Sequence, residues 1–282
     1  MNLQLQATRV AMRALERTAP GLGAALAERL FFTPPHSALT ASARDLLVTG
    51  RRLRVSVDEG RVAAWAWGHG PAVALVHGWG GRGGRLASAF VAPLVDSGFS
   101  VVTFDAPGHG DSDGTLSSMP QVARALTAVA DAAGSLFGIV AHSMGGSASA
   151  LAMAHGLQLE RAVFLSPAAD PARYAQDFAK LLAVGPASLA GMRRRSEARL
   201  RLRWSDLNVT RLAAGLETPL LVVHDQDDPT VPWEEGAAIA AAWPGAEFVT
   251  TTGLGHRDIV RDADVVARAV AFLRTSSGAH GR

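Results

Sequence analysis

The chain has 282 residues, of which 48% are hydrophobic and 18% charged, a composition typical of globular rather than disordered proteins. It contains no cysteine, which excludes disulfides, thiolate chemistry and cysteine-based metal sites. All but one of its 27 basic residues are arginine, yet the formal net charge is only +2, so the charge balance indicates no nucleic-acid partner.

Two helical patterns begin the chain. Residues 2–18 carry arginines four apart on one face, and a second pattern runs from 22 to 32. A basic amphipathic helix can lie on a membrane, but such segments more often pack their apolar side on the domain, which we favour. The start lacks the apolar region of a signal peptide, and no window reaches the roughly 18 apolar residues of a membrane span. We therefore expect a cytoplasmic protein without stable membrane insertion.

Short apolar runs alternating with helical patterns follow. A hairpin is predicted from Arg51 to Trp67, around the turn Asp58-Glu59-Gly60. Further strands are predicted at 72–76, 101–104, 136–140, 162–165, 219–223 and 248–251, and helices at 85–96, 118–133, after residue 143 and at 258–273. This alternation predicts an α/β fold, a mostly parallel twisted sheet of about eight strands flanked by helices.

An excess of about fifty residues separates the strands at 162 and 219, more than one crossover helix needs. We predict a helical cap or lid at 168–215, and we interpret its arginines between Arg193 and Arg203 mostly as a solvated face. The expected organisation is a helical extension at 1–50, the α/β core at 51–167 and 216–282, and the cap between its two parts.

Ser143 lies where a predicted strand turns into a helix, in the segment AHSMGG. The residues two before and two after it, Ala141 and Gly145, are small, as a nucleophile elbow requires for its tight turn. The same pattern also fits a turn that only packs a helix against a sheet. A serine nucleophile needs a histidine base, an orienting acid and an oxyanion hole, which the rest of the chain must supply.

The segment HGWGG directly follows the strand at 72–76, where a hydrolase has its first oxyanion loop. We expect the backbone amide of Trp79 to be one donor and that of Met144, at the start of the elbow helix, to be the other. A phosphate cradle is disfavoured because the loop lacks both the GxGxxG spacing and the lysine of a P-loop.

The candidate base is His256, in a loop between the last strand and the last helix that can reach back to the elbow. Three aspartates, Asp225, Asp227 and Asp228, follow the strand at 219–223 and compete for the role of the acid. Capping of the next helix explains one of them without any catalytic role.

Together these motifs resemble the α/β-hydrolase fold superfamily over residues 53–274. HGWGG resembles its oxyanion motif, DAPGHGDS resembles its D-x-P-G-x-G-x-S segment, which supports the active-site floor without catalysing, and AHSMGG resembles its elbow. The order Ser143, Asp228, His256 matches the family's nucleophile, acid and histidine, with Asp228 aligned on the pattern G-x-x-D-x-x-V-P. The chain departs from the family at Ala141 and at Asp225, two positions where glycine is commoner, and the second departure leaves Asp227 as a rival acid.

The resemblance implies a serine hydrolase that cleaves carboxylic esters of small molecules through an acyl-enzyme. It assigns Ser143, His256 and Asp228 to the triad and the amides of Trp79 and Met144 to the oxyanion hole. It implies no metal and no organic cofactor. Two alternatives stay open: an acyltransferase or thioesterase using the same acyl-enzyme, and a non-catalytic ligand receptor on the same scaffold.

Overall fold

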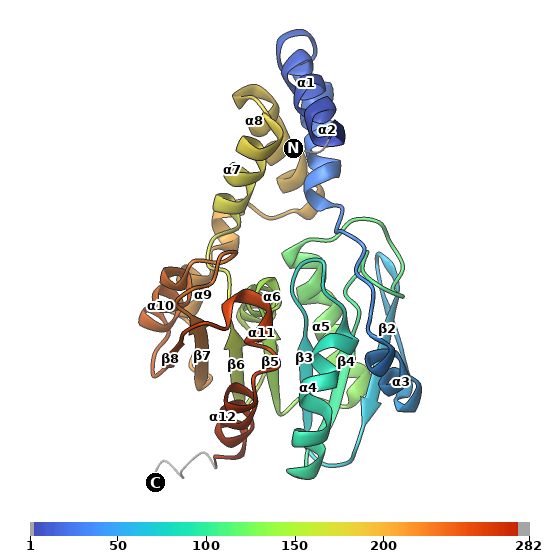
Figure 1. Cartoon of the computed structure of the whole chain (residues 1–282), viewed down its shortest axis with the longest axis vertical. Helices are drawn as coiled ribbons and strands as arrows, with labels where there is room; N and C mark the ends of the chain where they lie inside the picture. Colours follow the sequence, from blue (N-terminus) through green and yellow to red (C-terminus); the bar gives the residue numbers. More distant parts are fainter. Residues whose placement is uncertain (1–2, 276–282) are drawn as a thin grey trace. The chain divides into compact units, whose positions relative to one another are not determined.

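An eight-stranded sheet organises the computed structural model, which describes residues 3–275 (Figure 1). The strand order is β1-β2-β4-β3-β5-β6-β7-β8; β1, β2 and β4 are antiparallel neighbours, and all other pairs are parallel. The bounds are β1 (Arg51–Val57), β2 (Gly60–Trp67), β3 (Ala72–Val76), β4 (Ser100–Phe104), β5 (Gly138–His142), β6 (Arg161–Leu165), β7 (Leu220–Asp225) and β8 (Glu247–Thr251). The predicted α/β class is confirmed.

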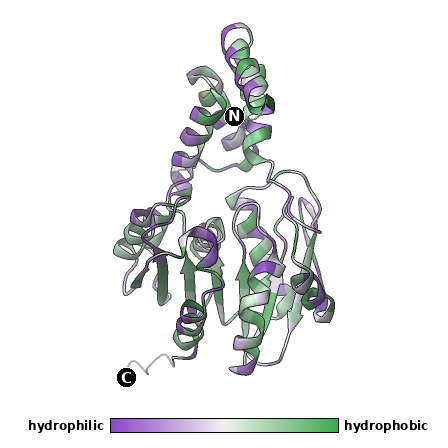
Figure 2. Ribbon diagram, viewed as in Figure 1, coloured by the Kyte–Doolittle hydropathy of each residue, from purple (hydrophilic) through white to green (hydrophobic). Residues whose placement is uncertain are grey.

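Helices cover both faces of this sheet (Figure 1). One face packs on α3 (Ala41–Thr49), α4 (Gly83–Asp96) and α12 (Ala263–Arg274), and the other on α5 (Met119–Ala133), α6 (Met144–Ala154), α9 (Val209–Ala213) and α10 (Trp233–Ala242). Because both faces are covered, the central strands are apolar along their whole length, as Figure 2 shows.

Two elements of the sheet unit (Pro35–Ala169 with residues 209–275) differ from the sequence expectation. The structure contains α3, which the sequence pattern did not reveal; Thr40 caps it, and Leu47 packs on Trp65 of the hairpin. The helix predicted at 258–273 begins only at Ala263, as α12, and a separate short helix, α11 (Gly255–Asp258), precedes it. The break occurs because the Asp262 side chain accepts hydrogen bonds from the amides that start α12.

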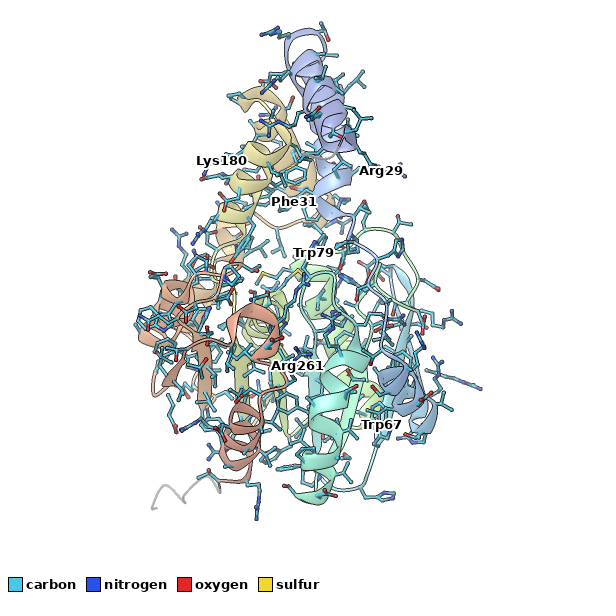
Figure 3. All side chains as sticks on the ribbon, viewed as in Figure 1. Arg29, Phe31, Trp67, Trp79, Lys180 and Arg261 are labelled. Atoms are coloured by element: carbon cyan, nitrogen blue, oxygen red, sulfur yellow. The ribbon has the colours of Figure 1, made fainter. Side chains whose placement is uncertain are left out.

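The remaining helices form a second compact unit, the helical unit, from residues 3–34 together with Asp170–Asn208. Its elements are α1 (Leu3–Thr18), α2 (Pro20–Phe32), α7 (Pro171–Leu182), α8 (Pro186–Leu200) and the 3₁₀ turn η1 (Trp204–Leu207). Met12 and Met192 are buried in its core, and Phe31 packs on Phe178 and Trp204 (Figure 3). The two segments that the sequence assigned to an extension and a cap thus bury their apolar faces in one common core.

Ion pairs within the helical unit use several of its arginines. Glu28 is almost completely buried and accepts hydrogen bonds from Arg195 and Arg199, both at 2.9 Å. Arg199 also stacks over the Phe32 ring, and Arg193 pairs with Glu197 at 2.9 Å. The side chains of Arg193 and Arg195 remain about half exposed while they form these pairs. In the described part of the chain, no helix is both long and apolar enough to cross a membrane.

Candidate active site

Ser143 lies at the sharp turn between β5 and α6, at the carboxyl edge of the sheet. Its backbone has φ 53° and ψ −125°, a region that residues with a side chain rarely adopt, and its amide donates to Leu165 O at 2.9 Å. A Cβ on Gly145 would lie only 2.4 Å from Val76 O, so this close approach requires glycine. Ala141 is buried in β5 opposite Val76, and its methyl group is accommodated there. The predicted elbow geometry is present.

The loop after β3 lies directly against this serine. A Cβ atom added to Gly78 would lie only 2.8 Å from Ser143 Cβ, so the two segments can approach this closely only because residue 78 is glycine. Trp79 is 39% exposed in this loop (Figure 3). Within residues 3–275 the Trp79 amide has no hydrogen-bond acceptor. The Met144 amide is the first of α6, and the first amides of a helix have no acceptor within the helix. Two backbone donors are thus available beside Ser143.

Two buried histidines hold this loop in place. His77 Nε2 accepts from the Ala106 amide at 2.9 Å while its Nδ1 donates to Gly78 O at 2.8 Å. His109 Nε2 accepts from the Gly80 amide at 3.0 Å. Burial lowers the pKa of both imidazoles, that of His109 to about 4, so both are neutral and keep an acceptor nitrogen at pH 7. The sequence placed these histidines in motifs without revealing this role.

Asp105 ties the D-x-P-G-x-G-x-S segment to the start of α4. Its buried carboxylate accepts from the Gly83 amide at 2.8 Å, from the Asp111 amide at 2.9 Å and from Arg82 at 2.9 Å. A Cβ on Gly110 would collide with the same carboxylate, because it would lie 1.9 Å from Oδ2. All these contacts are internal to the scaffold, so Asp105 supports the site and does not face it.

Asp228 and His256 are joined by a hydrogen bond of 2.7 Å between Oδ2 and Nδ1. The Asp228 side chain is completely buried, and its Oδ1 accepts from the amides of Thr230 at 2.8 Å and Val231 at 2.9 Å. Burial alone raises the pKa of Asp228, but the hydrogen bonds from His224, His256 and these amides outweigh burial and hold the pKa well below its usual range. The carboxylate is therefore ionised at neutral pH.

Asp227 has a different partner. Its exposed side chain accepts from the Gly253 amide at 3.0 Å and makes no contact with the His256 ring among the described residues. Of the rival acids, Asp228 contacts His256, whereas Asp227 contacts Gly253 in the loop that precedes His256.

His142 connects the strand that precedes Ser143 to the helix that carries His256. Its Nε2 donates to His256 O at 2.8 Å, and the two imidazole rings lie 4.6 Å apart. Burial, together with the neighbouring His256, lowers the pKa of His142 to about 3, so the ring stays neutral. Because His142 directly precedes Ser143, this bond fixes the place of the α11 backbone relative to the elbow.

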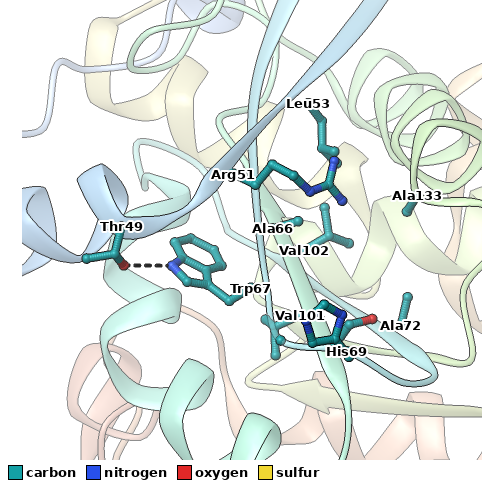
Figure 4. Close-up of a pocket in the computed structure, with 12 residues that line it drawn as sticks. Thr49, Arg51, Leu53, Ala66, Trp67, His69, Ala72, Val101, Val102 and Ala133 are labelled. Carbon is teal, nitrogen blue, oxygen red and sulfur yellow. Dashed lines mark hydrogen bonds between the residues drawn. The ribbon is translucent and has the colours of Figure 1, made fainter.

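A separate pocket of about 310 Å³ lies at the other edge of the sheet, where β3 and β4 begin. Arg51 and Leu53 of β1, His69 and Ala133 line it (Figure 4), and none of the predicted catalytic residues does. Within residues 3–275, no group of three His, Asp or Glu side chains is arranged to hold a metal ion.

Comparison with known proteins identifies the family over most of the chain. The model of the family described as "Alpha/beta hydrolase family" matches residues 73–269. A pimeloyl-[acyl-carrier protein] methyl ester esterase of Xanthomonas campestris pv. campestris (strain B100) is 32% identical over 248 residues, covering 72% of this chain and 94% of the relative. The enzyme of the same name from Xanthomonas axonopodis pv. citri is 29% identical over the same shares.

Solved structures show the same fold at lower identity. A hydrolase from Pseudomonas aeruginosa PA01 superposes with a TM-score of 0.63 at 20% identity, over 80% of this chain and all of that chain. An esterase from Exiguobacterium antarcticum gives a TM-score of 0.61 at 13% identity, with the same coverage. At such identities the likeness concerns the fold alone.

Proposed function

This chain belongs to the alpha/beta hydrolase family and is a carboxylic ester hydrolase, and we propose that it forms an acyl-enzyme on Ser143. The observation that carries the proposal is the 2.7 Å hydrogen bond from His256 Nδ1 to the buried carboxylate of Asp228. With its proton held on Nδ1, the imidazole has a free lone pair on Nε2 for the serine proton. Ser143 Oγ then attacks the ester carbonyl as His256 takes that proton.

The tetrahedral intermediate carries a negative oxygen that needs donors. We assign them to the amides of Trp79 and Met144, which lie beside Ser143 and lack other acceptors among the described residues. Each such donor is worth about 10² to 10³ in rate. When the intermediate collapses, His256 returns the proton to the leaving alcohol. Water, activated by the same histidine, then releases the acid.

The proposed substrate is a methyl ester of an acyl chain attached to a carrier protein, after the relatives that bear this activity in their names. The charge of the helical unit supports this: its sequence holds twelve Arg and Lys residues against six Asp and Glu. Such a surplus attracts an acidic protein over long range and accelerates its association. The proposal places enzyme and carrier together in the cytoplasm.

The substrate proposal is tested with two methyl esters of the same acyl chain, one on an acyl-carrier protein and one free. We expect a higher kcat/KM for the carried ester, with an advantage that shrinks as salt rises from 50 to 500 mM, because salt screens exposed charges. Equal kcat/KM for the two esters at low salt would contradict the substrate proposal while leaving the ester hydrolase itself untouched.

The acyl-enzyme is tested by trapping. A fluorophosphonate should label Ser143 at one equivalent per chain, and Ser143→Ala should remain unlabelled. Product analysis with added alcohol and thiol acceptors then separates hydrolysis from acyl transfer. Labelling elsewhere, or an acyl-ester product that dominates at low acceptor concentration, would contradict the proposed reaction.

A further inference from the structure

Asp225 is a buried acid without a place in the triad. It is the last residue of β7, it is completely inaccessible, and no Lys or Arg pairs with it among the described residues. It also occupies the position where the family pattern usually has glycine. A buried, uncompensated carboxylate is costly, so the contacts that stabilise it indicate its role.

The donors to Asp225 come from the loop that leads to His256. Its Oδ2 accepts from the Thr251 hydroxyl at 2.7 Å and from the Leu254 amide at 3.1 Å. Its Oδ1 accepts from the Asp227 amide at 3.0 Å, inside the loop that carries the acid. One carboxylate therefore holds both loops that bring the acid and the histidine together.

The surrounding backbone reinforces this link. Asp225 and Thr251 are direct partners in the β7–β8 register, and the Gln226 amide donates to Thr251 O at 2.8 Å. Between the end of β8 at Thr251 and the start of α11 at Gly255, residues 252–254 belong to no helix or strand, and Gly253 has a positive φ. The buried carboxylate of Asp225 constrains this segment, and the exposed carboxylate of Asp227 adds one bond at the Gly253 amide.

The carboxylate is charged as well as buried. Burial raises the pKa of Asp225, but the bonds from Thr251 and from loop amides outweigh burial and lower the pKa. Hydrogen bonds to an ionised acceptor are about twice as strong as neutral ones. Moving the loop away would leave Oδ2 of this carboxylate without donors, so the loop is held firmly.

We propose that Asp225 is a positioning residue for His256, holding the loop of residues 251–255 so that the imidazole meets the carboxylate of Asp228. The proposal rests on the acyl-enzyme mechanism proposed above. Asp225 touches neither the substrate nor the imidazole, and it acts only through the loop. The family's usual glycine has no side chain with which to form such a clamp.

The test compares Asp225→Asn and Thr251→Val with the matched control Asp227→Asn. The first variant removes the charge with little change of shape, and the second removes one donor but keeps the charge. Active sites are titrated with a fluorophosphonate so that kcat refers only to reactive protein. We expect Asp225→Asn to lower kcat about 10- to 100-fold with KM within about twofold, because a misplacement near 1 Å costs up to 10²-fold.

Thr251→Val should lower kcat in the same direction by a smaller factor, and it covers the case in which Asp225→Asn fails to fold. The downfield proton resonance of the Nδ1–H···Asp228 hydrogen bond should broaden in both variants and stay sharp in Asp227→Asn. A purely structural role would lower Tm and leave kcat per titrated site and this resonance unchanged, which would overturn the proposal. Failure of the mechanism itself would appear separately, as activity retained by Ser143→Ala.

Discussion

Replacing Asp228 by asparagine tests the triad acid directly, because the structure predicts how the new amide orients. The Oδ1 position accepts from the amides of Thr230 and Val231 at 2.8 and 2.9 Å, so the asparagine oxygen takes that place. The NH₂ group then faces His256 Nδ1, at the position of the oxygen that now lies 2.7 Å away. An NH₂ group can only donate, so the imidazole must hold its proton on Nε2.

That tautomer cannot take the proton of Ser143. The same exchange in a serine protease triad lowers kcat by about 10⁴. Flipping the amide gives no rescue, since its NH₂ would face the N–H groups of Thr230 and Val231, and the loss of the acceptor for buried Val231 would cost about 1–3 kcal/mol. We therefore expect Asp228→Asn to lose about 10⁴ in kcat on a short-chain p-nitrophenyl ester while the protein stays folded.

Asp227→Asn is the matched control, one residue away in the same loop. Its side chain is exposed and contacts only the Gly253 amide, so asparagine can keep that bond through its own oxygen. Exposed substitutions of this kind change energies by about 0.5 kcal/mol, which corresponds to roughly twofold in kcat. A larger loss for Asp227→Asn than for Asp228→Asn would refute the assignment of the acid and the tautomer argument with it.

Three further outcomes are expected. Ser143→Ala should lose about 10⁶ in kcat with an unchanged Tm, and substantial residual turnover would exclude Ser143 as the nucleophile. Buried His109 and His142 have pKa values of about 4 and about 3 in the folded state, below the ordinary value of 6.5. Both histidines therefore bind protons more readily when unfolded, and stability in urea should be full above pH 6.5 and fall as the pH drops towards 4; a flat profile would contradict this. Gly145→Ala should lower Tm and activity together, because the new methyl group collides with a backbone oxygen; unchanged values of both would show that the elbow can relax.

The order of the strands and of the motif loops is a local property, and the sequence was sufficient for it, although it did not reveal α3 or α11. Short continuous apolar runs marked the strands of the parallel sheet, and small residues around Ser143 marked the turn. Parallel strands end at one edge, so the loops after β3, β5 and β7 meet there whatever their detailed contacts. The predicted roles of Ser143, Trp79 and Met144 rest on this placement and await the experiments above.

Contacts between distant segments were decided only by the tertiary structure. Three aspartates within four residues have the same local chemistry, and only the folded chain brings Asp228 to His256 while Asp225 holds the loop of residues 251–255. For the same reason, the amino-terminal helices share a core with residues 170–208, which no local pattern could indicate. Hydrogen bonds across many residues depend on where whole elements pack, because burial and direction, more than residue type, determine which donor meets which acceptor.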